Sequence, residues 1–126
     1  MVRTVAAIIQ EDGKFLLIRR ANTSVFEGYW ALPGGKIDGD IPRRAVIKEV
    51  KEETSLDFNP FYFARYEEHF PQYGWDADTD VFSGSYSGNV RINEEASDFG
   101  WFSLEEIEKM DIAFHHRRII KDFASK

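Results

Sequence analysis

The chain has 126 residues, and its 43% hydrophobic and 30% charged residues are typical of a globular protein, which excludes an intrinsically disordered chain. Cysteine is absent, so disulfides and thiolate zinc sites are excluded, and this fits a reducing compartment. The net charge of −6 and the lack of a basic stripe argue against binding to duplex nucleic acid.

No segment of the chain is suited to targeting or to membrane insertion. No apolar run approaches the ~20 residues that cross a bilayer, and the run over residues 5–9 is too short for the core of a signal peptide. We therefore expect a soluble, cytoplasmic protein that does not bind a membrane, with residues 1–126 forming a single domain. An acidic protein that handles an anionic ligand usually needs a divalent cation between the two, which directs attention to the carboxylates.

The N-terminal half begins with a predicted hairpin and continues into a loop and a helix. Strands are expected over residues 2–10 and 15–19, because Asp-Gly between them is a strong signal for a tight turn. Residues 22–39 are rich in glycine and read as a loop. A helix is expected over residues 41–54, with Asp40 as its N-cap and a proline in its first turn. The side chains expected to face the core from this helix are Ala45, Val46, Ile47 and Val50.

The C-terminal half is expected to be mainly strands, with two helices near the end. The predicted elements are strands over residues 61–70 and 79–86 joined by a polar loop over 71–78, short strands over 90–92 and 99–102, a short helix opened by a capping box at Ser103 and Glu106, and a helix over 113–124. No repeat or linker interrupts this order.

The predicted helix over residues 41–54 carries a cluster of carboxylates. Glu49 lies three residues before Glu52 and four before Glu53, so all three project from neighbouring positions on one side of the helix. Hard oxygen ligands in such a cluster suit Mg²⁺ or Mn²⁺. An ordinary solvated face is the alternative, because helices rich in Glu and Lys are common.

The glycine-rich segment before this helix favours the functional reading. Pro33, Gly34 and Gly35 allow bare backbone to approach a ligand, and a loop that leads into a helix start can place backbone groups beside a metal or a phosphate. Trp30 is expected to anchor the loop by burial. An ordinary Pro-Gly-Gly turn, which is frequent, is the alternative, and the combination of loop, N-capped helix and acidic triple within about twenty residues favours a functional site.

Residues 34–56, Gly-Gly-Lys-Ile-Asp-Gly-Asp-Ile-Pro-Arg-Arg-Ala-Val-Ile-Lys-Glu-Val-Lys-Glu-Glu-Thr-Ser-Leu, resemble the Nudix box. The residues that match the pattern are Gly34, Glu49, Val50, Glu52, Glu53 and Leu56. Upstream, Trp30-Ala31-Leu32-Pro33-Gly34-Gly35 is similar to the family's usual lead-in, and the order of the flanking elements also agrees.

Four features depart from the box, and all of them concern its scaffold. The loop after the second glycine is one residue short, Asp40 replaces Glu, Lys48 replaces Arg, and Ser55 replaces Gly. In the family, the Glu–Arg pair ties the loop to the helix. Asp is shorter and Lys cannot form a bidentate fork, although the shorter loop leaves an ion pair between Asp40 and Lys48 open. Ser55 must then accept a left-handed C-cap.

The resemblance implies an α+β protein with the Nudix fold, a mixed β-sheet sandwiched between α-helices. It implies a hydrolase that cleaves a pyrophosphate bond in a nucleoside-diphosphate-linked substrate with Mg²⁺ or Mn²⁺. Its implied metal ligands are Glu49, Glu52, Glu53 and a backbone carbonyl of Gly34 or Gly35. A later carboxylate often completes such a site, and Glu95 is the first candidate and Glu94 the second. The general base is a box glutamate or, as its rival, Glu95.

The substrate stays open between a nucleoside triphosphate, ADP-ribose and another nucleotide sugar. Residues 113–120 faintly resemble the tail of some ADP-ribose-type enzymes. Candidates for contact with a substrate, each with packing or solvent exposure as the alternative, are Phe26, Tyr29, Tyr73, Trp75, Arg19, Arg65, Arg91, His69, His115 and His116. A second hypothesis is a Nudix-fold module that binds a nucleotide without turnover. Many relatives are dimers, so a homodimer is a further expectation.

Overall fold

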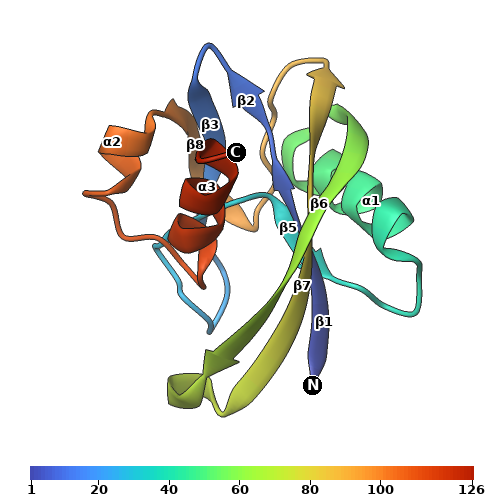
Figure 1. The fold of residues 1–126 in the computed structure, drawn as a ribbon, viewed down its shortest axis with the longest axis vertical. Coiled ribbons are helices and arrows are strands. Elements are labelled where there is room, and N and C mark those ends of the chain that lie inside the picture. The colour runs from blue at the N-terminus through green and yellow to red at the C-terminus, as the bar shows by residue number, and fades with distance from the viewer.

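Two β-sheets and three α-helices make up the protein, which a computed structural model describes over residues 1–126. The first sheet has the order β5 (Gly34–Lys36), β1 (Val2–Ile8), β7 (Trp75–Ser87) and β6 (Asp57–Phe70). It is mixed, because β1 and β7 run parallel while the other pairs are antiparallel. Figure 1 shows α1 (Pro42–Thr54) on one side of this sheet and α2 (Leu104–Ile107) and α3 (His116–Ala124) on the other. The predicted mixed sheet between helices is thus confirmed.

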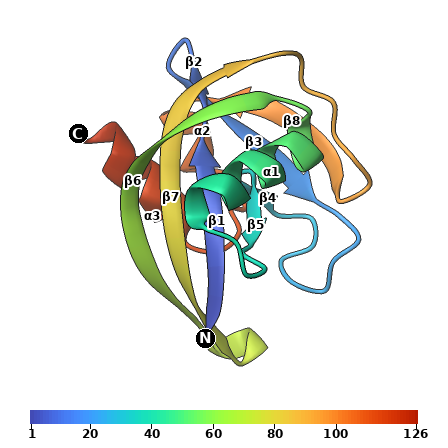
Figure 2. The same cartoon turned by 90° about the vertical axis from the view of Figure 1, so that its right-hand side faces the viewer.

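The second sheet is built around β3. Its strands are β2 (Gln10–Glu11), β3 (Lys14–Arg20) and β4 (Trp30–Ala31), with β8 (Ala96–Phe102) paired to the other edge of β3. Figure 2 shows the molecule from the side of α1. The helix lies in front of β1, and β7 and β6 curve along the left of the view. No helix is long and apolar enough to cross a membrane.

The N-terminal hairpin forms as predicted, but its first strand is divided between the two sheets. Asp12 and Gly13 have φ angles of 51° and 76°, as a type I′ turn requires, and they connect β2 to β3. β1 ends at Ile8, and the carbonyl of Ile9 accepts a hydrogen bond of 2.9 Å from the Leu16 N–H. The predicted strand over residues 2–10 therefore serves one sheet and then the other.

The hairpin of β6 and β7 is longer than predicted. The turn is limited to the 3₁₀ helix η1 (Pro71–Tyr73) and Gly74, so the loop predicted over residues 71–78 is wrong for its last four positions. Residues 75–79 belong to a half-buried strand. Ala77 and Thr79 lie on its buried face, while the polar residue Asp76 lies on its exposed face.

Several other predicted elements differ from the structure. The predicted loop over residues 22–39 contains the short strands β4 and β5, and β6 begins at Asp57 rather than at residue 61. Residues 90–92 form no strand, and β8 begins at Ala96 rather than at residue 99. α3 begins at His116 rather than at residue 113, because the N–H of Ala113 donates to the carbonyl of Trp30 at 2.7 Å and Phe114 has a φ of 56°. The predicted capping box at the start of α2 is confirmed, with both reciprocal hydrogen bonds present.

The core lies in two clusters on the two sides of the first sheet. Val46 and Val50 of α1 pack with alternate residues of β1, including Val5, whereas Ile119 and Ile120 of α3 belong to the other cluster. The predicted core face of α1 is confirmed, because its Ala45, Val46 and Val50 are buried and Ile47 packs beside them. Glu49 and Glu53 lie next to Val46 and Val50 on α1, so the same packing places their carboxyls against the glycine strand β5.

Candidate functional site

The three predicted metal ligands on α1 lie on one side of the helix but in different surroundings. Glu53 is only 6% exposed, and its Oε1 accepts a hydrogen bond of 3.2 Å from the N–H of Gly34. Glu49, one turn earlier, is half-buried. Glu52 is exposed, and its Oε1 lies 3.9 Å from Nζ of Lys48. The helix therefore presents two carboxyls to β5 and one to solvent.

β5 needs glycine at its first two positions because its neighbours approach too closely for a side chain. The strand pairs with β1, and a Cβ at Gly34 would overlap the backbone carbonyl of Val5. A Cβ at Gly35 would lie 2.6 Å from Oε2 of Glu49. The two glycines thus allow the backbone of β5 to lie directly against the carboxyls of α1.

Burial and mutual repulsion make the two inner carboxyls hard to ionise. Burial is the main cause that raises the pKa of Glu53 well above its usual range, and the Glu49 and Glu95 carboxylates raise it further. The hydrogen bond from Gly34 acts in the opposite direction. Burial also raises the pKa of Glu49, followed by repulsion from Glu52. A cation held between these groups would remove the repulsion.

Glu95 reaches the same place from a distant part of the chain. The N–H of Ala21 donates to the Glu95 carbonyl at 2.9 Å, and the Asn93 side chain donates to the carbonyl of Glu52 at 3.0 Å. These bonds hold the loop before β8 between the end of β3 and the last turn of α1. The Glu95 carboxylate is among the charges that raise the pKa of both inner carboxyls, whereas Glu94 is not.

The groups gathered here fit a hard divalent cation such as Mg²⁺ or Mn²⁺, because all of them offer oxygen. A side chain at Gly35 would collide with the Glu49 carboxyl, so the glycine allows this carboxyl to lie against the backbone of β5, where both offer oxygen to a cation. No three His, Asp or Glu side chains already form a complete metal site. Glu53 is held by Gly34 and Glu52 faces solvent, so a cation would have to draw them together.

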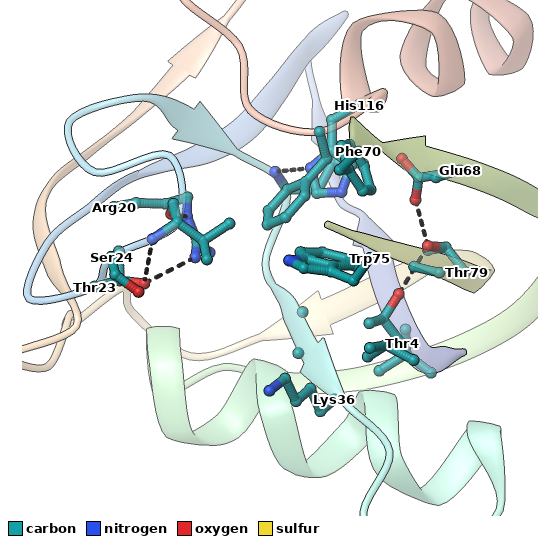
Figure 3. Close-up of a pocket in the computed structure, with 18 residues that line it drawn as sticks. Thr4, Arg20, Thr23, Ser24, Lys36, Glu68, Phe70, Trp75, Thr79 and His116 are labelled. Atoms are coloured by element: carbon teal, nitrogen blue, oxygen red, sulfur yellow. Dashed lines mark hydrogen bonds between the residues drawn. The ribbon is translucent and has the colours of Figure 1, made fainter. Parts of the chain in front are cut away.

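A pocket of about 440 Å³ opens on the other side of the glycine strand (Figure 3). Both Gly34 and Gly35 line it, so the pocket and the carboxyl cluster share one boundary. Figure 3 shows Arg20 on one side of the Phe70 and Trp75 rings, with Glu68 and Thr79 on the other. The remaining side chains of interest in its walls are Thr4, Phe114 and His116.

Comparison with known proteins explains this arrangement. The family model described as NUDIX domain matches residues 1–123. This chain belongs to the Nudix family. It is 33% identical to ADP-ribose pyrophosphatase from Methanocaldococcus jannaschii, across 94% of this chain and 70% of that protein. It is 30% identical to nucleoside triphosphatase NudI from Salmonella agona, across 93% of this chain and 94% of that one.

Solved structures agree with the family assignment. The MutT protein from Methanosarcina mazei Go1 superposes with a TM-score of 0.86 at 29% identity, covering 98% of this chain and 93% of that one. The predicted Nudix fold is therefore confirmed, and the protein is a Nudix hydrolase.

At the altered positions of the Nudix box, the ion pair that the sequence left open between Asp40 and Lys48 does not form. Oδ1 of Asp40 lies 3.7 Å from Arg44, and Lys48 lies beside Glu52, so Asp40 and Lys48 do not pair. Asp40 is also not the N-cap, because Ile41 holds that position and no side chain caps the helix. The left-handed C-cap predicted at Ser55 is confirmed, with a φ of 67°.

The arginine nearest this Nudix site is one that the sequence did not single out. Arg20 lines the pocket, whereas Arg19, Arg65 and Arg91 do not. Nε of Arg20 donates to the carbonyl of Val25 at 3.0 Å, which fixes the guanidinium. A register shift between Arg19 and Arg20 interrupts the alternation of β3, so the pattern of inward and outward residues gives no signal for Arg20.

Of the four aromatic candidates for stacking, only Trp75 lines the pocket. Phe26 packs edge-on against Tyr29 and Tyr73, with ring centres 5.4 and 5.1 Å apart, so packing is the role of these three side chains. Phe114, which the sequence did not single out, forms the wall next to Arg20, with the guanidinium carbon 4.8 Å from its ring centre.

The three histidines have separate places. His116 lines the pocket, and its Nδ1 accepts a hydrogen bond of 3.0 Å from the N–H of Leu32. The backbone N–H of His115 donates to Oε2 of Glu68 at 2.9 Å. His69 is exposed near the turn of the β6–β7 hairpin and does not line the pocket.

Replacing each of the two glycines of this box with alanine is expected to affect the protein differently. Gly34→Ala sets a methyl group against backbone, which cannot move aside, and should lower the free energy of unfolding by roughly 1–3 kcal/mol. Gly35→Ala meets the end of a flexible side chain, so the protein should fold with the Glu49 carboxyl displaced. Urea unfolding and turnover of a nucleotide, measured on both variants, should show mainly lost stability in the first and mainly lost activity in the second. Equal stability of the two would contradict the backbone overlap.

Proposed function

We propose that this Nudix hydrolase uses a divalent cation, Mg²⁺ or Mn²⁺, to hydrolyse a pyrophosphate bond in a nucleoside-diphosphate-linked substrate. The observation that carries the proposal is that Gly34 and Gly35 contact the box carboxyls on one side and line the pocket on the other. A nucleotide whose base enters the pocket would have its phosphates beside the carboxyls. The proposal takes residues 1–126 as one domain.

The cation would be held on the α1 side of the glycine strand. The groups proposed to hold it are a backbone carbonyl of Gly34 or Gly35 and the carboxylates of Glu49, Glu52, Glu53 and Glu95. When bound, a divalent cation neutralises phosphate oxygens and lowers the pKa of the attacking water. These carboxylates repel one another, and their repulsion costs stability when no cation is bound. Their presence beside the bare backbone of β5 supports this assignment.

A box glutamate is proposed as the general base. The oxygen of water forms a bond to phosphorus, the bond from phosphorus to the bridging oxygen breaks, and its electron pair leaves with the second phosphate. The proton of the water passes to a carboxylate. Burial raises the pKa of Glu53 well above its usual range, so its carboxylate accepts a proton more strongly than an exposed glutamate does. Glu95, exposed at the same edge, is the rival.

The pocket supplies the groups that would bind the nucleoside and the nearest phosphate. Trp75, Phe70 and Phe114 offer rings for stacking on a base. Arg20 is held in place by Val25 and carries a charge that would attract phosphate. The names of the two relatives, an ADP-ribose pyrophosphatase and a nucleoside triphosphatase, support a nucleotide substrate of one of these two kinds.

A panel of substrates tests the proposal. Nucleoside triphosphates, dinucleoside polyphosphates, ADP-ribose and other nucleotide sugars are incubated with Mg²⁺, with Mn²⁺ and with EDTA, and the products are separated by chromatography. We expect cleavage of at least one class with either cation and none with EDTA. For each substrate, the two phosphate-containing products identify which phosphorus–oxygen bond of the pyrophosphate was cleaved.

A nucleotide-binding module without turnover is the alternative, and the missing pair between Asp40 and Lys48 favours it. If no substrate in the panel is hydrolysed but a nucleotide binds in a calorimeter, the result supports this alternative and rejects the proposed hydrolysis. The homodimer stays a prediction, which light scattering on the purified protein can check.

A further inference from the structure

Three hydroxyl and carboxyl side chains form a hydrogen-bonded chain on the pocket wall (Figure 3). They come from three adjacent strands: Thr4 from β1, Thr79 from β7 and Glu68 from β6. Oγ1 of Thr4 lies 2.7 Å from Oγ1 of Thr79, and Thr79 donates to Oε1 of Glu68. The backbone N–H of His115 donates to the other oxygen of Glu68. Glu68 and Thr79 are each only 2% exposed.

The direction of the hydrogen bonds in this chain follows from chemistry. A carboxylate can only accept, so the single hydroxyl proton of Thr79 points to Glu68. Thr79 therefore accepts from Thr4, and the proton of Thr4 is used in that bond. Thr4 is half-buried, which makes it the open end of the chain. What it offers to a ligand in the pocket is an acceptor.

His116 offers a hydrogen-bond donor, where Thr4 offers an acceptor. Its Nδ1 accepts from the Leu32 N–H, so in the neutral ring the proton lies on Nε2. Burial lowers the pKa of His116 to about 3, which keeps the ring neutral. Both His116 and Thr4 line the pocket, with the Phe70 and Trp75 rings as further walls. His116 thus adds a donor and Thr4 an acceptor to a pocket that has surfaces for stacking.

We propose that this pocket selects nucleobases that carry an amino group, such as cytosine or adenine, over uracil or hypoxanthine, with Thr4 accepting from the amino group and His116 donating to the base. The inference rests on the proposed function, because it takes the pocket as the base site. Uracil and hypoxanthine present a carbonyl oxygen where the amino group stands. To meet that oxygen, Thr4 would have to turn its proton away from Thr79, which leaves a buried acceptor without its donor.

Matched nucleotide pairs test the selection, since the members of each pair differ only at the amino or carbonyl group and in the proton on the adjacent ring nitrogen. Binding of CMP against UMP, and of AMP against IMP, is measured by calorimetry in EDTA, and kcat/KM is measured for CTP against UTP and for ATP against ITP with Mg²⁺. We expect the amino member of each pair to be favoured by roughly 10- to 100-fold, the range of one unpaired buried group.

The variant that tests the mechanism is Thr4→Val, which keeps the shape of the side chain and removes the hydroxyl. It should lower the preference within each pair by removing the part that Thr4 contributes through the amino group, while Thr4→Ser, which keeps the hydroxyl, should retain the full preference. If Thr4→Val does not fold by circular dichroism, Thr4→Ala is used, because it removes the same hydroxyl and leaves the bond from Thr79 to Glu68 in place.

Each outcome decides the inference separately from the proposed function. Equal binding within the pairs, or a preference that is undiminished in the valine variant, overturns it even when all four triphosphates are hydrolysed. A preference in binding that depends on Thr4 supports it even if no triphosphate is cleaved, in which case only the proposed hydrolysis fails.

Discussion

Glu53→Gln is expected to lower kcat by about 10³-fold, within the range for removal of a general base. The amide keeps an oxygen that can accept from the Gly34 N–H, so the hydrogen bond between α1 and β5 is retained. What the variant loses is a negative charge and a group that can take a proton. Steady-state turnover of the best substrate from the panel, with saturating Mg²⁺, measures the loss.

The same variant is expected to be at least as stable as the unaltered protein when no metal is present. The pKa of Glu53 in the folded state is raised, so the folded protein binds more protons than the unfolded chain above the usual pKa of 4.5. Stability is therefore lost as pH rises through the raised pKa, and a neutral amide at this position avoids that loss. Urea unfolding in EDTA should show the variant gaining relative to the unaltered protein as pH rises.

A matched control separates the two effects. Glu105→Gln removes one exposed carboxylate from α2, away from the box, and should change neither kcat nor metal-free stability. A Glu53→Gln variant that keeps full turnover would reject Glu53 as base and as metal ligand, and would make Glu95 the next residue to replace. A variant that unfolds more readily in EDTA would contradict the cost of the buried charge.

The sequence predicted the parts of this site that lie close together along the chain. The helix with Glu49, Glu52 and Glu53 follows the glycine strand within about twenty residues, and a local pattern records such spacing. The turn at Asp12 and Gly13 and the C-cap at Ser55 were predicted for the same reason, because each depends on a few neighbouring residues.

The pocket depends on contacts that no local pattern records. Thr4 and Thr79 are 75 positions apart, and they meet only because β1 and β7 lie side by side. Glu68 and Thr79 read in the sequence as the polar positions of ordinary strands. A free solvated carboxylate and a carboxylate that is buried with two hydrogen-bond donors, as Glu68 is, have the same sequence signature. Glu95 was predicted only through the resemblance, since its loop reaches α1 by hydrogen bonds from Asn93 and Ala21.

His116 is the second place where a large effect of substitution is expected, and it concerns stability against acid. Burial, and then the charges of Arg20 and His115, lower the pKa of His116 from 6.5 to about 3. Between these two values the unfolded chain binds a proton that the folded protein does not, so stability falls as pH falls through this window. At about pH 4.5 the loss relative to neutral pH amounts to roughly 2–3 kcal/mol.

His116→Asn isolates this contribution because asparagine can place an oxygen where Nδ1 accepts from the Leu32 N–H, and it does not titrate. Urea unfolding of both proteins is followed at several pH values between neutral and about pH 4.5. The carboxyls near the site titrate in both proteins, so the difference between the two curves belongs to His116. We expect the unaltered protein to lose its advantage as the solution is acidified, since only its folded state must exclude a proton. Parallel curves would mean that His116 takes up its proton in the folded state and that its ring is not held neutral beside the pocket.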